Sequence, residues 1–253
     1  RTITLTSQGQ AMRVYVVGDG APTGGAGILM CHDIFGGDSG RHKQICDRLA
    51  AEGYTVCMPD LFHDSYSSEE VDVPMWKLLT YLPKAFSQVL SRSWSPGVLQ
   101  DLQCTLGLMQ ELGVRSVGLV GFCYGAWPAM RASGGELPGV ACAVSAHPSV
   151  HNVASPGTGE GSAEAIVKGV QCPQLVLSTD NEPPAWRAGG DVSRWLAALP
   201  APLGPQSEVM NFPSGLQHGF VTRGDVSRAA VRDGVRLFLD ETVAFMALHV
   251  QRG

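Results

Sequence analysis

The chain has 253 residues, of which 44% are hydrophobic and 16% are charged, and its formal net charge is −5. This length and balance are ordinary for a globular α/β protein, and the negative charge argues against nucleic acid as a partner. No uninterrupted apolar run approaches the roughly 18 residues of a membrane span. We therefore expect a single domain over residues 1–253, a monomer or a homodimer, that binds neither nucleic acid nor membrane.

The seven cysteines include no CxxC pair. This spacing gives no reason to expect a zinc site or a redox motif, and we expect neither a metal nor a cofactor. Residues 1–20 lack the charged and apolar regions of a secretory signal. We therefore expect free thiols in a reducing cytoplasm. Because the chain does not begin with Met, an organellar location after removal of a transit peptide is the alternative.

Strands and helices are predicted to alternate along the chain. Residues 2–6 and 12–17 flank a short polar turn and predict an antiparallel hairpin at the edge of a sheet. Short apolar segments then predict strands at 27–31, 54–58, 116–120, 139–145, 174–178 and 208–212.

Apolar residues at helical spacing predict helices between these strands. One includes Ile45 and Leu49, a second covers residues 98–109, and the last begins near Asp225 with Leu248 on its buried side. Apolar strands separated by helices indicate a mostly parallel sheet with helices on both faces.

Two further segments show no regular pattern. Residues 62–90 carry Trp76 and Tyr81 and are expected to form the wall of a pocket. Residues 155–161 are rich in Gly and Ser and are expected to form a loop.

The most informative segment joins a predicted strand to a predicted helix. Residues 116–126 read SVGLVGFCYGA, in which an apolar strand leads into G-x-C-x-G. This is the pattern of a nucleophile elbow with Cys123 in place of serine. Gly121 and Gly125 would remove the Cβ atoms that collide in so tight a turn, and the N-terminus of the following helix favours a thiolate. We expect Cys123 to be the nucleophile; the alternative is a buried structural cysteine.

A thiol nucleophile needs a general base and an acidic residue that orients the base. In this architecture the acid and then the histidine follow the nucleophile along the chain, each in a loop after a strand. His218 follows the strand 208–212 and is the expected base, whereas His147 fits a structural role equally well. Asp180 directly follows the strand 174–178 and is the expected acid, with Glu182 as the runner-up.

Two backbone N–H groups are needed to bind the oxyanion of an acyl-transfer intermediate. One is expected from Tyr124, directly after the nucleophile. The other is expected in the loop after the strand 27–31, where Ile34 is the best single choice.

Five segments in this order resemble the dienelactone hydrolase family of the α/β-hydrolase superfamily: HDIFG (32–36), AEGYTVCMPDLF (51–62), GFCYG (121–125), HPS (147–149) and HGFVTRGD (218–225). The resemblance covers nearly the whole chain. It implies an α/β-hydrolase fold, an activity like that of carboxymethylenebutenolidase, and a Cys-His-Asp triad that maps onto Cys123, His218 and Asp180.

The resemblance also bears on two charged residues. Bacterial members of the family often carry a glutamate where this chain has Asp33, and there it accepts a hydrogen bond from the resting thiol. Asp33 is one methylene shorter, as in some eukaryotic relatives, so a gating role stays open. Bacterial members also use arginines to hold a substrate carboxylate. Arg223 fits that role, and equally that of an ion-pair partner for Asp225 or another acid.

Two functions fit these observations. The first is a cysteine-dependent hydrolase of small lactones, esters or thioesters that works by acyl transfer through a Cys-His-Asp triad. The second is a ligand-binding or signalling protein on a hydrolase scaffold with little or no turnover, because a fold does not by itself determine function. The complete order of nucleophile, acid and histidine favours the enzyme.

Overall fold

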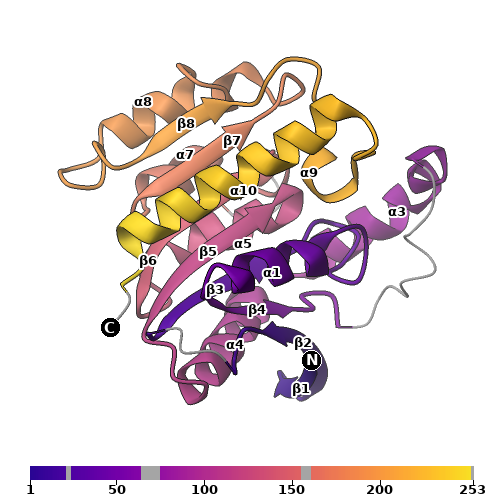
Figure 1. The fold of residues 1–253 in the computed structure, drawn as a ribbon, viewed down its shortest axis with the longest axis vertical. Coiled ribbons are helices and arrows are strands. Elements are labelled where there is room, and N and C mark those ends of the chain that lie inside the picture. The colour runs from indigo at the N-terminus through magenta and orange to yellow at the C-terminus, as the bar shows by residue number, and fades with distance from the viewer. Residues whose placement is uncertain (21–23, 64–74, 155–160, 252–253) are drawn as a thin grey trace.

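The computed structural model describes residues 1–20, 24–63, 75–154 and 161–251, and over 75–82 it describes the backbone alone. The described strands form one eight-stranded sheet in the order β1-β2-β4-β3-β5-β6-β7-β8 (Figure 1). Strands that are neighbours in this sheet are often distant in sequence, so helices must cross over between them.

The edge of the sheet is an antiparallel hairpin, as predicted. β1 (Thr2–Ser7) pairs with β2 (Gln10–Val17), and β2 pairs antiparallel with β4 (Thr55–Pro59). Every second side chain of β2, from Met12 to Val16, is buried. This alternation is typical of a strand with one face on the core.

Six of the described strands run parallel, and all of them except the edge strand β8 are largely buried on both faces. Within two residues at each end, they match the predicted strands: β3 (Ala26–Cys31), β4, β5 (Ser116–Phe122), β6 (Val140–Ala146), β7 (Gln174–Ser178) and β8 (Glu208–Asn211). Neighbouring residues of β3 belong to different cores, with Leu29 on one side and Met30 on the other. A strand covered on both faces needs this continuous apolar sequence.

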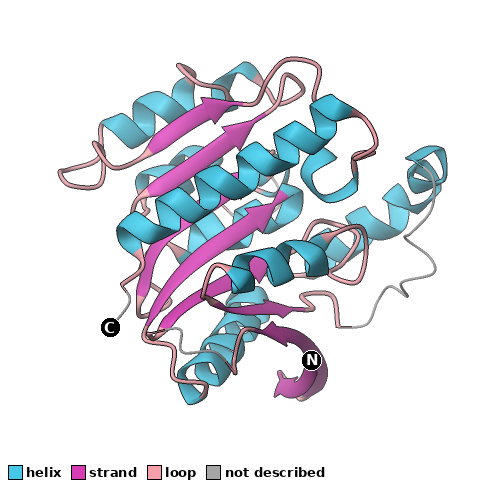
Figure 2. Ribbon diagram, in the orientation of Figure 1, coloured by secondary structure: helices cyan, strands magenta, loops and turns pink. Residues whose placement is uncertain are grey.

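Helices cover both faces of the sheet (Figure 2). α1 (His42–Ala51) and α10 (Ala229–His249) pack on one face, where Ile45 and Phe238 are buried. The other face is covered by α4 (Leu99–Glu111), α5 (Ala126–Ala132), α7 (Ala163–Lys168) and α8 (Asp191–Ala197). The remaining short helices are α6 (Val150–Val153), η3 (Pro184–Trp186) and α9 (Phe220–Arg223).

This arrangement is the α/β-hydrolase fold that the sequence predicted. It has a mostly parallel sheet, helices on both faces and an antiparallel hairpin at one edge. Within the ranges given above, no helix is both long enough and apolar enough to cross a membrane.

The prediction for residues 62–90 was wrong about structure. Residues 75–91 form the helix α3 (Met75–Ser91), which is followed by the helical turn η1 (Trp94–Val98). Pro83 lies inside α3, and a proline there removes a helical hydrogen bond and usually interrupts a helix. The side chains of Trp76 and Tyr81 lie outside the described residues, as does the loop 155–161 apart from Gly161.

The C-terminal helix also differs from its prediction. It begins at Ala229 rather than near Asp225, whose carboxylate accepts a hydrogen bond from the backbone N–H of Ser227 in a preceding turn. Leu248 was expected to be buried and is 78% exposed. Phe245 and Met246 are buried in the last turns, and Val250, directly after the helix, is buried as well.

Candidate active site

The predicted elbow is present at the end of β5. Cys123 lies in the short turn η2 (Cys123–Gly125) before α5 and has a positive φ of 53°. A Cβ atom on Gly121 would lie 2.3 Å from the carbonyl oxygen of Gly125, and a Cβ atom on Gly125 would lie 2.2 Å from that of Cys31. Neither position accepts a side chain, so the two glycines allow the backbone to turn beneath Cys123.

Cys123 is 8% exposed, and two polar residues, Ser149 and His218, lie near its thiol. Its Sγ lies 3.4 Å from the hydroxyl oxygen of Ser149, and the backbone N–H of Ser149 donates to the carbonyl of Cys123 at 3.0 Å. The side chain of His218 lines the same cavity as the thiol, and the interaction between the two groups raises the pKa of the imidazole. Sequence reasoning missed Ser149, although it belongs to the HPS motif at the end of β6.

His218 lies between β8 and α9, where the sequence placed the base. Its Nδ1 is 2.6 Å from Oε1 of Glu182, which is buried. The second oxygen of Glu182 accepts hydrogen bonds from the hydroxyl of Thr179, at 2.7 Å, and from the backbone N–H of the same residue. Because the carboxylate is held on both oxygens, it fixes the imidazole and leaves Nε2 for the thiol.

Two opposing effects set the pKa of His218. Burial lowers it, but the hydrogen bonds with Cys123 and Glu182 outweigh burial and raise the pKa to about 10. The protonated imidazole is therefore stabilised in the site. A histidine in this state can accept the proton of a thiol and keep it while the sulfur reacts.

Asp180 was the expected acid, and the structure corrects this prediction. Its carboxylate is exposed and accepts hydrogen bonds from the hydroxyl of Ser214, at 2.7 Å, and from the backbone N–H of Gly215, at 3.2 Å. The chain turns after β7, which brings Glu182 back toward Thr179. The residue that contacts His218 is therefore Glu182, the runner-up.

A cavity of about 270 Å³ lies over the thiol. Cys123 and His218 line it together with Ile34 and Tyr124, the two residues expected to supply the oxyanion N–H groups. Its other described lining residues are Phe86, Val89, Leu90, Arg92, Ser93, Ser149, Asn152 and Val153. Since three of these belong to α3, the expectation of a pocket wall is confirmed for the end of the segment 62–90.

Asp33 and Arg223 contact each other rather than line this cavity. Nε of Arg223 lies 3.2 Å from one oxygen of Asp33 and Nη2 lies 3.3 Å from the other, and the guanidinium also stacks on the ring of Phe35 at 4.4 Å. Burial alone would raise the pKa of Asp33, but Arg223 and His42 hold it well below its usual range. Of the two roles left open for Arg223, this geometry matches the ion-pair partner.

Asp33 has further partners that leave little freedom for gating. Its two oxygens accept hydrogen bonds from the backbone N–H of Phe35, at 2.9 Å, and from the hydroxyl of Thr222, at 3.0 Å. The carboxylate is thus used to join the loop after β3 to α9.

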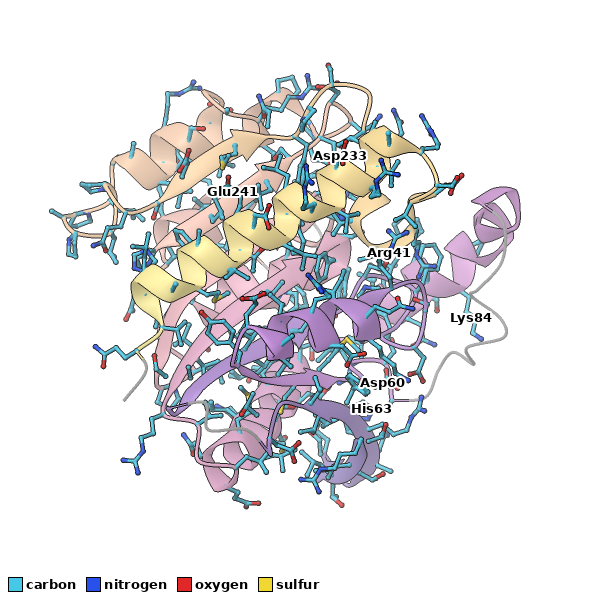
Figure 3. All side chains as sticks on the ribbon, in the orientation of Figure 1. Arg41, Asp60, His63, Lys84, Asp233 and Glu241 are labelled. Carbon is cyan, nitrogen blue, oxygen red and sulfur yellow. The ribbon has the colours of Figure 1, made fainter. Side chains whose placement is uncertain are left out.

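The same loop holds the segment after His218 at a second point. The guanidinium of Arg41 donates to the carbonyl oxygens of Phe220 at 2.9 Å and Val221 at 2.8 Å. The backbone N–H of Arg41 donates to the carbonyl oxygen of Thr222 at 2.9 Å. Arg41 lies at the end of α1 that faces this segment (Figure 3). A Cβ atom on Gly40 would lie 2.4 Å from the carbonyl oxygen of Thr222, so the two backbones are in direct contact.

His147 lies beneath the base. It is fully buried, and its ring makes an edge-to-face contact with that of His218, with 5.1 Å between centroids. Within the described chain neither ring nitrogen has a hydrogen-bond partner. Burial and the neighbouring His218 lower the pKa of His147 well below its usual value. A neutral ring here supports His218 by packing.

Solved structures share the fold of this chain, and a family model matches most of its length. The fold is shared with a Klebsiella pneumoniae protein (TM-score 0.67, 21% identity, 98% of this chain and 97% of that one) and with dienelactone hydrolase from Anabaena variabilis (TM-score 0.59, 16% identity, 99% and 98%). Residues 12–239 match the dienelactone hydrolase family, and the chain belongs to this family.

A curated relative extends this finding. The chain is 28% identical over 217 residues to the hydrolase tropI of Talaromyces stipitatus. The matched region covers 83% of this chain and 76% of that protein. Family membership places the chain among the hydrolases of small esters and lactones.

Proposed function

We propose that this chain hydrolyses small esters, lactones or thioesters by acyl transfer through Cys123, His218 and Glu182. One observation carries the proposal. Cys123 and His218 line the same cavity, and Nδ1 of His218 is 2.6 Å from the buried carboxylate of Glu182. A protein that only binds a ligand has no need of an oriented base beside a cysteine in a strained turn.

In the first half-reaction, Nε2 of His218 takes the proton of the Cys123 thiol. The thiolate attacks the carbonyl carbon of the substrate, so that a C–S bond forms and the carbonyl oxygen becomes an oxyanion. The backbone N–H groups of Ile34 and Tyr124 stabilise that oxyanion. The bond to the leaving group then breaks, the leaving group takes the proton from His218, and Cys123 is left as an acyl thioester.

In the second half-reaction, His218 takes a proton from a water molecule, whose oxygen attacks the thioester carbonyl. The C–S bond breaks, the sulfur leaves as a thiolate that regains the proton from His218, and the carboxylic acid is released. Throughout, Glu182 holds the Nδ1–H of His218 and stabilises the imidazolium formed in each half.

Single-turnover acylation tests this proposal. p-Nitrophenyl acetate mixed with the protein should release one equivalent of p-nitrophenol in a fast phase, and mass spectrometry should find the acetyl group on Cys123. Cys123→Ala should lose both signals, whereas Cys104→Ala, which removes a partly exposed thiol on α4, should keep them. Acylation that persists in Cys123→Ala would assign the nucleophile elsewhere, and no acylation of the intact protein would favour the binding protein.

A further inference from the structure

The cavity over Cys123 is lined mainly by apolar side chains. Its lining includes the apolar residues Ile34, Val89 and Val153, and the polar lining residues Ser93, Ser149 and Asn152 are uncharged. Apolar walls favour apolar substrate groups because burial removes both surfaces from water.

The apolar surface continues outward along α3. Phe86 and Leu90 line the cavity and are nevertheless 53% and 73% exposed. They are four residues apart, so they lie on one face of the helix. Among the described residues, the other large hydrophobic side chains exposed to this degree are Val226 and Leu248, which do not line the cavity. Two of these four exposed apolar residues therefore lie together at the mouth of the cavity.

The cavity contains one permanently charged side chain among its described lining residues, Arg92. Its guanidinium forms an ion pair with the fully buried carboxylate of Asp101, which also accepts hydrogen bonds from the hydroxyl of Ser7, at 2.6 Å, and the ring of His63, at 3.1 Å. The positive charge of Arg92 is thus balanced by a buried carboxylate that Ser7 and His63 hold in place. Such a cation gives little attraction to a second anion.

Arg223, which follows His218 by five residues, also has a carboxylate partner inside the protein. It is paired with Asp33 and stacked on Phe35, and it does not belong to the described lining. Arg92 and Arg223 therefore each have a carboxylate partner inside the protein. Among the described lining residues, a substrate carboxylate would lose its hydration without gaining an arginine that lacks such a partner.

We propose that the site selects neutral substrates with an apolar acyl chain or ring, and discriminates against substrates that carry a carboxylate. This inference rests on the proposed hydrolase function. The acyl group occupies the space between Ile34, Val89 and Val153, and a longer group continues over Phe86 and Leu90 on α3.

A matched pair of esters tests the selectivity. p-Nitrophenyl 6-methylheptanoate and mono-p-nitrophenyl adipate have acyl groups of nearly the same shape, and the second carries a carboxylate where the first carries two methyl groups. After correction for their rates of reaction with hydroxide, we expect kcat/KM to be at least about tenfold higher for the neutral ester. Equal rates, or a faster anionic ester, would overturn the substrate class.

A charge placed at the mouth provides a second, independent measurement. Leu90→Arg introduces a cation without a carboxylate partner at an exposed position and should reduce the preference for the neutral ester severalfold. Leu248→Arg makes the same substitution at an exposed leucine near the end of α10 and should leave the preference unchanged. If the two variants behave alike, the region of α3 around Leu90 is not the mouth of the substrate site.

The outcomes separate this inference from the hydrolase proposal. If neither ester acylates Cys123 while p-nitrophenyl acetate does, the cavity does not accept acyl groups of this size and the inference fails alone. If no ester acylates Cys123, the hydrolase proposal and the inference fail together. If the adipate ester acylates Cys123 faster, hydrolysis stands and the neutral substrate class is rejected.

Discussion

The carboxylate beside His218 shows how two neighbouring residues with the same chemistry acquire different roles. Asp180 remains at the surface with Ser214, whereas Glu182 is buried and held by Thr179. A buried carboxylate acts on the imidazole through a less polar medium than an exposed one and therefore stabilises its charged form more strongly.

This difference predicts unequal effects of two isosteric substitutions. Glu182→Gln should lower kcat/KM by about 10²-fold or more, because it removes the negative charge that holds the imidazolium. Asp180→Asn should change kcat/KM less than about threefold. Steady-state hydrolysis of one activated ester by both variants provides the comparison. A larger loss in Asp180→Asn would restore the original assignment of the acid.

The seven thiols should differ sharply in reactivity. Burial raises the pKa of Cys31 and Cys57 to about 12 and that of Cys172 to about 11, and it raises the pKa of Cys46 and Cys142 as well. Thiols in this state form little thiolate at neutral pH. We therefore expect iodoacetamide to label Cys123 first and Cys104 second.

Brief labelling followed by peptide mass spectrometry measures this order. Cys104→Ser is the control, since it removes the other accessible thiol and should leave the rate at Cys123 unchanged. His218→Ala should slow labelling of Cys123, because the imidazole that accepts its proton is gone. Early labelling of Cys31 or Cys57 would be incompatible with their burial.

At the scale of secondary structure, the elbow depends on close contact between backbones. Gly125 touches the end of β3 at Cys31 and His32, so β3, β5 and α5 meet at one point beneath Cys123. The loop after β3 that carries Ile34 begins at the same point. The positions of the proposed nucleophile and of the proposed oxyanion donors are therefore linked through a residue with no side chain.

Gly125→Ala should consequently prevent normal folding or displace Cys123. Its Cβ atom would lie 2.2 Å from one carbonyl oxygen and 2.5 Å from the next, and backbone atoms cannot yield as a flexible side chain can. Gly107→Ala is the matched control in α4, where a Cβ atom meets nothing within 4 Å. It should raise the unfolding free energy by up to about 1 kcal/mol. Urea unfolding measures the unfolding free energy of both variants. A Gly125→Ala variant that is stable and active would disprove the elbow geometry.

At the scale of the whole molecule, the Asp33–Arg223 pair joins segments 190 residues apart in sequence. The pKa of Asp33 is depressed in the folded protein. The pair therefore stabilises the fold fully at pH values above the pKa of an aspartate in the unfolded chain, about 3.9. That stability is lost as the pH falls through the folded pKa of Asp33.

Arg223→Met should therefore be destabilising in a pH-dependent manner. At pH 7 we expect a loss of about 3 kcal/mol, because a buried carboxylate is left without its main cation. At pH 4.5 the loss should be smaller, since burial raises the pKa of Asp33 in the variant and the carboxyl group becomes neutral. Urea unfolding at both pH values is the measurement. Arg236→Met, at an exposed arginine of α10, should change the unfolding free energy little at either pH. An equal loss of unfolding free energy in Arg223→Met at both pH values would contradict the assigned role.

The sequence predicted the strands and the turn at Cys123 better than it predicted which side chains contact one another. Its buried strands are short, continuous apolar segments, and the G-x-C-x-G turn has a steric cause that is local, so both could be recognised without a structure. The choice between Asp180 and Glu182 depends on how a turn folds back, and the pairing of Arg223 with Asp33 depends on tertiary packing. The helix α3 was missed because Pro83 argues locally against it, and tertiary packing overrides such local preferences.

The contacts of Arg41, Gly40 and Asp33 with the segment 220–224 have a consequence for engineering. The loop after β3 supplies the Ile34 N–H, and the segment that follows His218 is bonded to that loop through backbone atoms. Residues 32–41 and 218–224 should therefore be treated as one unit in any redesign. A chimera that imports either half alone would inherit a mismatched pair, whereas exchange of both together could redesign the site while leaving the sheet intact.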